Sequence, residues 1–180
     1  MGEVVKYLSK QDIERVHLQL RFKVRNRHIF DLLLNTGLRV GELCKIEFQD
    51  VRLNVLTIRA GIAKNRKERI IPLNNIALGV INKLMELRAR KLGRYQQNDK
   101  ILGVSVRRVQ KIFEELKEGV SINLTPHKCR HTFATRLVNS GVSTRIVQVL
   151  LGHADISSTE IYTFVTREAL QEAVALLEKR

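Results

Sequence analysis

The chain has 180 residues and a hydrophobic fraction of 44%, which suits one globular domain with its own core and argues against disorder. No stretch approaches the roughly 20 apolar residues of a membrane-spanning helix, and the N-terminus lacks the apolar segment of a signal peptide. The excess of 32 Lys and Arg over 18 Asp and Glu gives a net charge of +14 and a pI of about 10.3, which favours a polyanionic partner such as nucleic acid. Net charge alone does not separate such a protein from a ribosome-like or membrane-surface protein.

The two cysteines, Cys44 and Cys129, lie in different apolar patterns and have no CxxC spacing. Both are therefore expected to be buried thiols of a reduced, cytosolic protein. A zinc site made of Cys129, His127 and His131 is an alternative, but these spacings match no common ligand pattern. We expect no metal.

The first 50 residues predict three helices. Ser9 is a typical N-cap with Asp12 three residues later, and apolar residues continue this helix at helical spacing: Ile13, Val16, Leu20 and Val24. A second helix passes through Ile29 and residues 32–34 and stops near Gly37, a natural C-terminal glycine. After "TGLR", the stretch "VGELCKI" predicts a short third helix.

From Val51 the residue types change to those of strands. "VRLNVLTIR" is rich in β-branched residues, and "KERIIPL" is a second short apolar run that ends at Pro72. The basic, glycine-containing stretch between them predicts a β-hairpin whose tip presents Lys64, Arg66 and Lys67.

Helical patterns return in the second half, over 76–92 and about 105–116, with the polar loop "GRYQQNDK" between them. A helix then starts at Pro126 with Thr125 as N-cap, and its buried stripe is spaced by four residues: Cys129, Phe133 and Leu137. His127 and Arg130 share a different face of this helix.

Three more helices complete the prediction. Ser143 begins one and Gly152 ends it, a capping box from Ser157 to Glu160 places Tyr162 in a short helix, and a last amphipathic helix spans 167–178. The expected fold class is mainly α with a small antiparallel β-sheet (α+β).

Several polar residues interrupt this regular pattern in a fixed order: Arg39, Lys64, His127, Arg130, His153 and Tyr162. Each alone has an ordinary structural explanation, such as a surface arginine or a helix-capping histidine. Together the series Arg, Lys, His-x-x-Arg, His, Tyr resembles the tyrosine recombinases, the family of phage integrases and Xer-type resolvases. The resemblance extends over nearly the whole chain and is to the Xer-like branch of the family. It rests on four motifs: "TGLRVGEL", "KNRKERIIPL", "LTPHKCRHTFAT" and "LLGHADISSTEIYTFV".

The resemblance implies attack of the Tyr162 oxygen on a DNA phosphodiester, giving a 3′-phosphotyrosyl enzyme and a free 5′-hydroxyl. Arg39 and Arg130 are then expected to bind the phosphate, because a guanidinium is permanently charged and its planar fork matches two phosphate oxygens. His127 and His153 are expected to donate hydrogen bonds to the same phosphate, and one of them could accept the tyrosine proton.

The remaining roles follow from the same resemblance. Lys64 is expected to protonate the leaving 5′-oxygen, and Glu42, three residues after Arg39, to orient His127 or Arg39. The neighbouring basic residues Arg66, Lys67 and Lys128 are expected to contact the DNA backbone, and His131 is expected to be structural. The fixed positive charges of the arginines replace a metal ion, and the phosphotyrosyl bond conserves the energy of the broken DNA linkage. We therefore expect that no cofactor is required.

Tyrosine recombinases usually carry an N-terminal helical domain, and the residues before Arg39 are too few for it. We therefore expect residues 1–180 to form a single catalytic domain without the N-terminal core-binding domain. The expected partners are a double-stranded DNA recombination site and further copies of the chain, as a tetramer formed on DNA through the C-terminal segment, with no membrane partner. The expected location is the cytoplasm of a prokaryote, with a viral or plasmid gene as one possible source.

Two alternative functions stay open at this point. A type IB topoisomerase shares the Arg, Lys and Tyr chemistry, although the Xer-like words "RHTFATRL" and "LLGHADISST" argue against it. A DNA-binding accessory module that derives from a recombinase but has lost catalysis is the second alternative. The presence of every expected catalytic residue argues against such decay.

Overall fold

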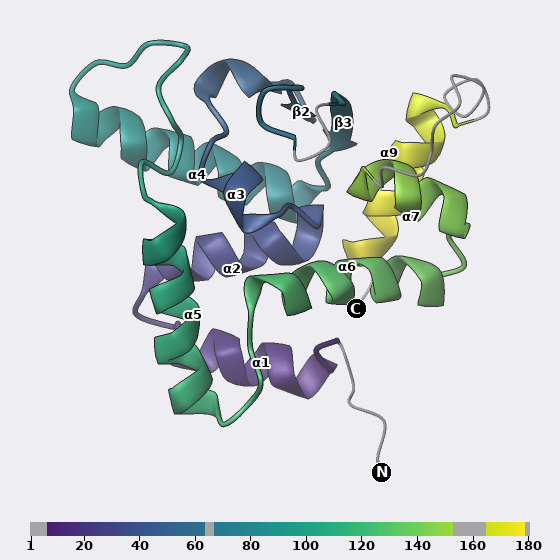
Figure 1. Ribbon diagram of the computed structural model, residues 1–180, viewed down its shortest axis with the longest axis horizontal. Helices are drawn as coiled ribbons and strands as arrows, with labels where there is room; N and C mark the ends of the chain where they lie inside the picture. The colour runs from purple at the N-terminus through teal and green to yellow at the C-terminus, as the bar shows by residue number, and fades with distance from the viewer. Residues whose placement is uncertain (1–6, 64–66, 153–164, 179–180) are drawn as a thin grey trace.

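The protein is described by a computed structural model over residues 7–63, 67–152 and 165–178 (Figure 1). It confirms a mainly helical fold with one small antiparallel sheet. The helices, in chain order, are α1 Lys10–Gln19, α2 Val24–Thr36, α3 Val40–Leu43, α4 Asn75–Leu92, α5 Val106–Val120, α6 Pro126–Asn139, α7 Thr144–Leu151 and α9 Arg167–Ala175, with 3₁₀ turns η1 Phe48–Asp50 and η2 Leu176–Glu178. The strands are β1 Val51–Arg52, β2 Val55–Ile58 and β3 Arg69–Pro72.

The first two helices divide at a different place from the one predicted. The Ser9 side chain accepts a hydrogen bond from the Asp12 amide, and the Asp12 carboxylate accepts one from the Ser9 amide, so the predicted start of α1 is confirmed. The helix ends at Gln19, however, and Val24 is the first residue of α2. The assignment of Val24 to the first helix was wrong, because a spacing that continues helical periodicity does not reveal that the backbone turns at residues 20–23.

The predicted hairpin is present as β2 and β3, which pair antiparallel from Val55 opposite Pro72 to Ile58 opposite Arg69. The stretch "VRLNVLTIR" is not one strand, as predicted, but two, because the chain reverses between β1 and β2. Leu53 makes this reversal with a φ of 54°, a conformation that leucine rarely adopts, so residue preferences did not reveal it.

Helix α2 forms the centre of the larger core. It packs against α4 on one side and α6 on the other, while α1 packs along α5 (Figure 1). The α2 side chains Ile29, Phe30, Leu32 and Leu33 are fully buried, as expected for a helix that neighbouring helices cover on two sides.

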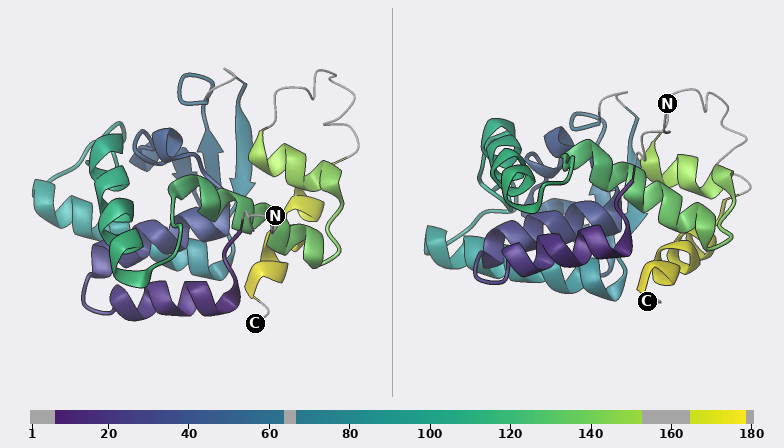
Figure 2. Two further views of the ribbon diagram at one scale, coloured as in Figure 1. Left: turned by 60° about the horizontal axis from the view of Figure 1, so that its bottom comes forward. Right: turned by 90° about the horizontal axis from the view of Figure 1, so that it is seen from below.

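A smaller core lies beyond α6, where α7 and α9 pack together and against β3 (Figure 2). Helix α6 contributes to both cores: Cys129 belongs to the larger one, and Phe133 and Leu137 belong to the smaller one. The predicted buried stripe of this helix is therefore confirmed, and it spans the boundary between the two hydrophobic clusters.

The ends of the C-terminal helices agree with the sequence signals. Thr125 caps α6 by accepting from the Lys128 amide, with Pro126 in the first turn. Ser143 caps α7, and Gly152 ends it in a left-handed conformation with a φ of 64°. The last helix starts at Arg167, as predicted, and continues through η2 to Glu178. The capping box predicted around Tyr162 lies outside the described residues.

None of the helices in the described ranges is both long enough and apolar enough to cross a membrane.

Substitution of Gly37 by alanine tests how tightly side chains pack at the boundary between the two cores. Its φ is 62°, and a Cβ added there would lie 2.5 Å from Phe133 Cδ1 and 2.9 Å from Leu151 Cδ2. Gly141 has a φ of 84°, but a Cβ there would meet no atom within 4 Å among the described residues. Both alanine variants should lose about 1–2 kcal/mol from the left-handed backbone. Gly37→Ala should lose a further ~1–3 kcal/mol from the clash.

Urea unfolding of the two variants measures this difference. Equal losses for Gly37→Ala and Gly141→Ala would show that the cores adjust around residue 37 without strain, against the tight packing described here.

Candidate active site

The candidate site is built around Glu42, a carboxylate that is only 2% exposed. Arg39 precedes the first turn of α3, and its backbone amide donates to Glu42 Oε2 at 2.9 Å. The Arg39 Nη1 also donates to Glu42 Oε1 at 3.2 Å. A carboxylate three residues into a helix reaches back to the start of that helix, which explains the spacing of Arg39 and Glu42. Of the two alternative partners expected for Glu42, His127 and Arg39, the structure shows contacts with Arg39.

Arg69, at the start of β3, is the second partner of Glu42 and was missed by the sequence analysis. Its Nη1 donates to Oε1 at 3.0 Å and its Nη2 to Oε2 at 2.8 Å, a two-pronged contact between groups that are both buried. Its Nε donates to the Leu150 carbonyl at 3.1 Å, near the end of α7. A signal was present, because Arg69 and Ile71 alternate onto the buried face of a short strand, and a charge buried there requires a partner.

The charge of Glu42 is favoured by its two arginines. Burial alone raises the pKa of this carboxyl, but the hydrogen bonds and positive charge of Arg69, with a smaller contribution from Arg39, lower the pKa below its ordinary value. Glu42 is therefore ionised at neutral pH and compensates part of the positive charge in the site.

Arg130 lies on α6 and is 7% exposed. Its Nη1 donates to the Gly37 carbonyl and its Nη2 to the Leu151 carbonyl, both at 2.7 Å, so it joins the end of α2 to the end of α7. Burial lowers the pKa of Arg130 to about 10, with a further contribution from the charge of Arg39, while Glu42 opposes the shift. Arg130 therefore stays protonated at neutral pH. Its two carbonyl partners place it beside the residues around Glu42, because Gly37 lies two residues before Arg39 and Leu151 follows Leu150, the partner of Arg69.

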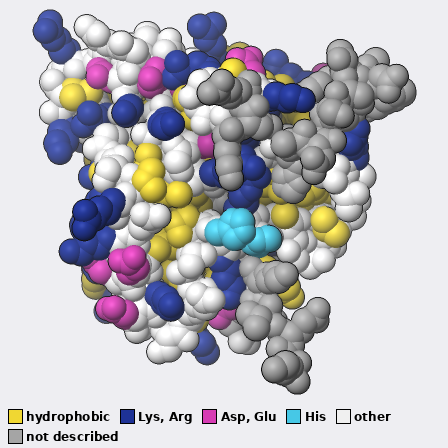
Figure 3. All heavy atoms as spheres, viewed as in Figure 1, with side chains coloured by type: hydrophobic (Ala, Val, Ile, Leu, Met, Phe, Trp, Pro, Cys, Tyr) yellow, Lys and Arg dark blue, Asp and Glu magenta, His cyan; other side chains and the backbone are white. Residues whose placement is uncertain are grey.

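His127 is exposed in the first turn of α6, one turn before His131. The two Nε2 atoms are 2.8 Å apart and the rings meet edge to face at 4.4 Å between centroids. One ring donates and the other accepts in this contact, and the tautomers decide which does which. Figure 3 shows histidine side chains near the centre of one face, with Lys and Arg side chains close by.

The other predicted residues are placed only in part. Lys67 is exposed just before β3, and Lys128 is half-buried in the first turn of α6. Lys64, Arg66, His153 and Tyr162 lie outside the described residues, so their roles remain predictions. The structure thus brings Arg39 and Glu42, at the start of α3, together with Arg130 of α6, and adds Arg69 of β3 to them.

The zinc alternative has no support in the geometry. Cys129 points into the larger core and is fully buried, whereas His127 is exposed. Burial raises the pKa of the Cys129 thiol and that of the Cys44 thiol, which disfavours the thiolate that binds zinc. Across residues 7–63, 67–152 and 165–178, no three His, Cys, Asp or Glu side chains are grouped as metal ligands. The expectation that both cysteines are buried is confirmed.

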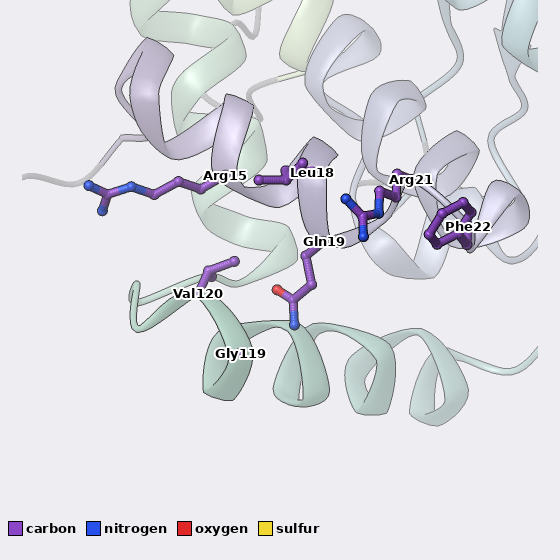
Figure 4. Close-up of a pocket in the computed structure, with 7 residues that line it drawn as sticks. All are labelled: Arg15, Leu18, Gln19, Arg21, Phe22, Gly119 and Val120. Atoms are coloured by element: carbon purple, nitrogen blue, oxygen red, sulfur yellow. The ribbon is translucent and has the colours of Figure 1, made fainter.

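A pocket between the ends of α1 and α5 lies apart from these residues (Figure 4). It is lined by Arg15, Leu18, Phe22 and Val120, among others, and none of the residues lining it is a predicted site residue.

Comparison with known proteins identifies the class to which this fold and site belong. Residues 6–169 match the Phage integrase family, so the chain belongs to that family, as its sequence motifs indicated. The chain is 36% identical over 167 residues to the tyrosine recombinase XerD of Halalkalibacterium halodurans, covering 88% of this chain and 56% of that protein. It is also 36% identical over 178 residues to the tyrosine recombinase XerA of Pyrococcus furiosus, covering 94% of this chain and 60% of that protein.

Solved structures confirm the fold. A crystal structure of XerA recombinase matches with a TM-score of 0.69 and 28% identity, covering 97% of this chain and 64% of that one. The Tn1549 transposon integrase, solved in complex with transposon right end DNA, matches with a TM-score of 0.70 and 22% identity, covering 98% and 66%. The chain thus has the tyrosine recombinase catalytic fold, and it spans little more than half the length of the curated relatives described above.

The lowered pKa of Glu42 predicts a pH dependence of stability. A glutamate in the unfolded chain titrates near its ordinary value of 4.5, and Glu42 in the folded chain titrates lower, so the unfolded state binds more protons in acid. The stabilisation by Glu42 is therefore complete above the unfolded value and is lost as the pH falls through the folded one. At pH 7, Glu42→Gln should cost about 3–5 kcal/mol, because it leaves Arg69 buried without its counter-charge.

Urea unfolding at pH 7 and pH 3.5 measures the effect, and the difference between wild type and Glu42→Gln should be smaller at the acid value. Glu86, which pairs with Lys83 and Arg90 on the surface of α4, provides the control, and Glu86→Gln should change stability little at either pH. A loss for Glu42→Gln that is independent of pH would contradict the ionised, arginine-bound state.

Proposed function

We propose that this chain cleaves and rejoins DNA strands as the catalytic domain of a site-specific recombinase, through a 3′-phosphotyrosyl intermediate at Tyr162. The observation that carries the proposal is the arrangement of arginines around one buried carboxylate: Glu42 binds Arg39 and Arg69, and Arg130 binds the carbonyl of Gly37, two residues before Arg39. Gathering several arginines in one place is costly, because their charges repel each other. Their proximity is useful where an anion binds between them, and a DNA phosphodiester is such an anion.

The arrangement suits the transition state of phosphoryl transfer. Negative charge gathers on the nonbridging oxygens as the tyrosine oxygen attacks, and cations fixed in advance stabilise it without reorganising. Arg130 is fixed through two backbone carbonyls, which leaves its other N–H donors to bind phosphate oxygens. Arg39 is fixed through Glu42 but remains 31% exposed, so it can reach a ligand at the surface.

The remaining groups supply proton transfer and nucleophilic attack. His127 lies one turn from His131, which gives it a partner for a proton that it takes up or donates near the phosphate. Tyr162 is the nucleophile, Lys64 the acid that protonates the leaving 5′-oxygen, and His153 a second donor to the phosphate. Each has the place in the sequence order that the family requires.

The partner is double-stranded DNA. The net charge of +14 supplies the nonspecific part of the affinity, and Arg66, Lys67 and Lys128 add contacts to the backbone. Support comes from the Tn1549 transposon integrase, whose solved structure contains DNA and whose catalytic fold matches this one. We further propose that the protein works in the cytoplasm of a prokaryote, as a homo-tetramer formed on DNA through its C-terminal segment.

A suicide substrate tests the proposal. In a duplex with a nick close to the cleavage site, the short released strand diffuses away and the protein remains covalently attached to DNA. A covalent band on a denaturing gel supports the enzyme, and its absence favours the non-catalytic accessory module. Strand exchange or Holliday-junction resolution by the same preparation separates a recombinase from a type IB topoisomerase.

Tyr162→Phe should abolish the covalent band. This substitution removes only the phenolic oxygen, so duplex affinity, which depends on the basic residues, should stay within about three-fold of wild type. A gel-shift titration and the suicide-substrate assay on the same preparation give both numbers. Normal adduct formation by Tyr162→Phe would refute the assignment of the nucleophile.

Lys64→Ala should cleave normal DNA poorly and recover on a substrate whose bridging 5′-oxygen is replaced by sulfur. A thiolate leaves without a proton, so the loss of a general acid no longer slows the reaction. The matched controls are Arg66→Ala and Lys67→Ala, which are expected to contact only the DNA backbone and to show no recovery. Recovery at Arg66 or Lys67 in place of Lys64 would assign the acid to that residue.

A further inference from the structure

We propose that Arg69 is a positioning residue for catalysis, which fixes the Arg39 guanidinium against the scissile phosphate by binding both oxygens of Glu42. The proposal rests on the proposed function of Arg39 as a phosphate-binding group. Arg69 itself is 4% exposed, so it does not touch DNA and acts only through Glu42.

The contacts show how Arg69 controls Arg39. Each oxygen of Glu42 accepts from both arginines: Oε1 from the two Nη1 atoms, and Oε2 from the Arg39 amide and the Arg69 Nη2. Arg69 therefore determines the plane of the carboxylate, and that plane determines the direction in which the Arg39 side chain is held. A carboxylate bound by a single point charge could rotate, and Arg39 would move with it.

A second set of contacts fixes Arg69 in turn. Its Nε donates to the Leu150 carbonyl, while Arg130 binds the carbonyl of Leu151, the next residue in α7. Arg69 and Arg130 are thus both attached to the last turn of the same helix. The position of Arg39 relative to Arg130 is then defined by one continuous series of hydrogen bonds: Arg39, Glu42, Arg69, Leu150–Leu151, Arg130.

The close approach at Gly152 supports this arrangement. A Cβ at residue 152 would lie 2.7 Å from the Arg69 Cδ, so the end of α7 leaves room for the arginine only because glycine stands there. The same glycine adopts the left-handed conformation that ends α7. Arg69 is therefore enclosed on the side of α7 as well as by Glu42.

The test compares Arg69→Lys with a control that breaks a similar buried pair elsewhere. Lysine keeps the charge but cannot bind both oxygens of Glu42. Asp50 is 3% exposed and binds Arg59 just after β2 and the Glu47 amide, so Asp50→Asn is the control for general loosening of this region. Both variants are compared with wild type at a temperature where thermal melting shows that all three are folded.

The first measurement is the single-turnover cleavage rate of the suicide substrate at saturating DNA. A misplacement of about 1 Å in a catalytic group costs on the order of 100-fold, so Arg69→Lys should lose that much while its Kd for duplex DNA changes less than about three-fold. Asp50→Asn should keep its rate within about three-fold. Equal losses in the two variants, or a normal rate for Arg69→Lys, would overturn the proposal.

A substrate whose bridging 5′-oxygen is replaced by sulfur distinguishes a misplaced Arg39 from a misplaced general acid. The Arg69→Lys defect should persist on that substrate, because a phosphate-binding guanidinium is still required when the leaving group needs no proton. Full recovery would show that Arg69 acts through the hairpin tip instead, and it would overturn the proposed action on Arg39.

A readout without cleavage separates this proposal from the proposed function. The heteronuclear NOE of the Arg39 Nε–H reports the order of that side chain in the protein alone. It should fall in Arg69→Lys and stay at the wild-type value in Asp50→Asn. An unchanged Arg39 signal in Arg69→Lys would overturn the positioning role even if the chain cleaves DNA, whereas failure of wild type to form an adduct would count against the proposed function only.

Discussion

The arrangement of the site depends on one buried carboxylate. Glu42 accepts hydrogen bonds from Arg39 and Arg69. Burial and the neighbouring arginines lower the pKa of Arg130, and the negative charge of Glu42 partly offsets this shift. Without a counter-ion of this kind, three guanidiniums could not stay close together in a region of low dielectric constant, because each would be desolvated and repelled by the others. The carboxylate also leaves the group positive as a whole, which is the condition for attracting a phosphate.

The position of these charges follows from the way the cores are divided. The larger core is centred on α2 and the smaller one on α7 and α9, and α6 contributes to both. Polar groups interrupt the packing between them: Arg130 joins the carbonyls of Gly37 and Leu151, and Arg69 joins Glu42 to Leu150. Some of the hydrogen bonds that connect the two cores are thus made by the residues to which we assign phosphate binding and its positioning, and Asn74 makes another by donating to the Val174 carbonyl. The stability of this boundary and the proposed phosphate binding thus depend on the same side chains.

Much of the fold was predictable because its signals are local. A helix start depends on capping by a nearby side chain, and the structure shows the predicted starts at Ser9, Thr125 and Ser143. A helix end often depends on a backbone angle that glycine favours, and the structure shows the predicted ends at Gly37 and Gly152. The two errors, at Val24 and Leu53, occur where the chain reverses without the glycine or proline that usually marks a turn.

The site was only partly predictable from the sequence. The resemblance named Arg39, Glu42 and Arg130, and the structure brings the start of α3, which holds Arg39 and Glu42, together with Arg130 of α6. Arg69 was missed because its importance comes from a partner 27 positions earlier in the chain, and a strand pattern alone does not specify which carboxylate a buried arginine meets. The His127–His131 contact is intermediate in this respect, since a spacing of four residues on a helix predicts proximity but not a hydrogen bond between the two rings.

The central claim is that Arg39 and Arg130 bind one phosphate as a unit. The most direct measurement is the single-turnover cleavage rate of the suicide substrate by Arg39→Lys, Arg130→Lys and the double variant, each shown to be folded. Because lysine keeps the charge but lacks the fork, each single variant should lose about 100-fold or more, and the double should be little slower than the slower single variant, since groups acting together are not additive. A rate within a few-fold of wild type for either single variant, or losses that multiply in the double, would contradict the account.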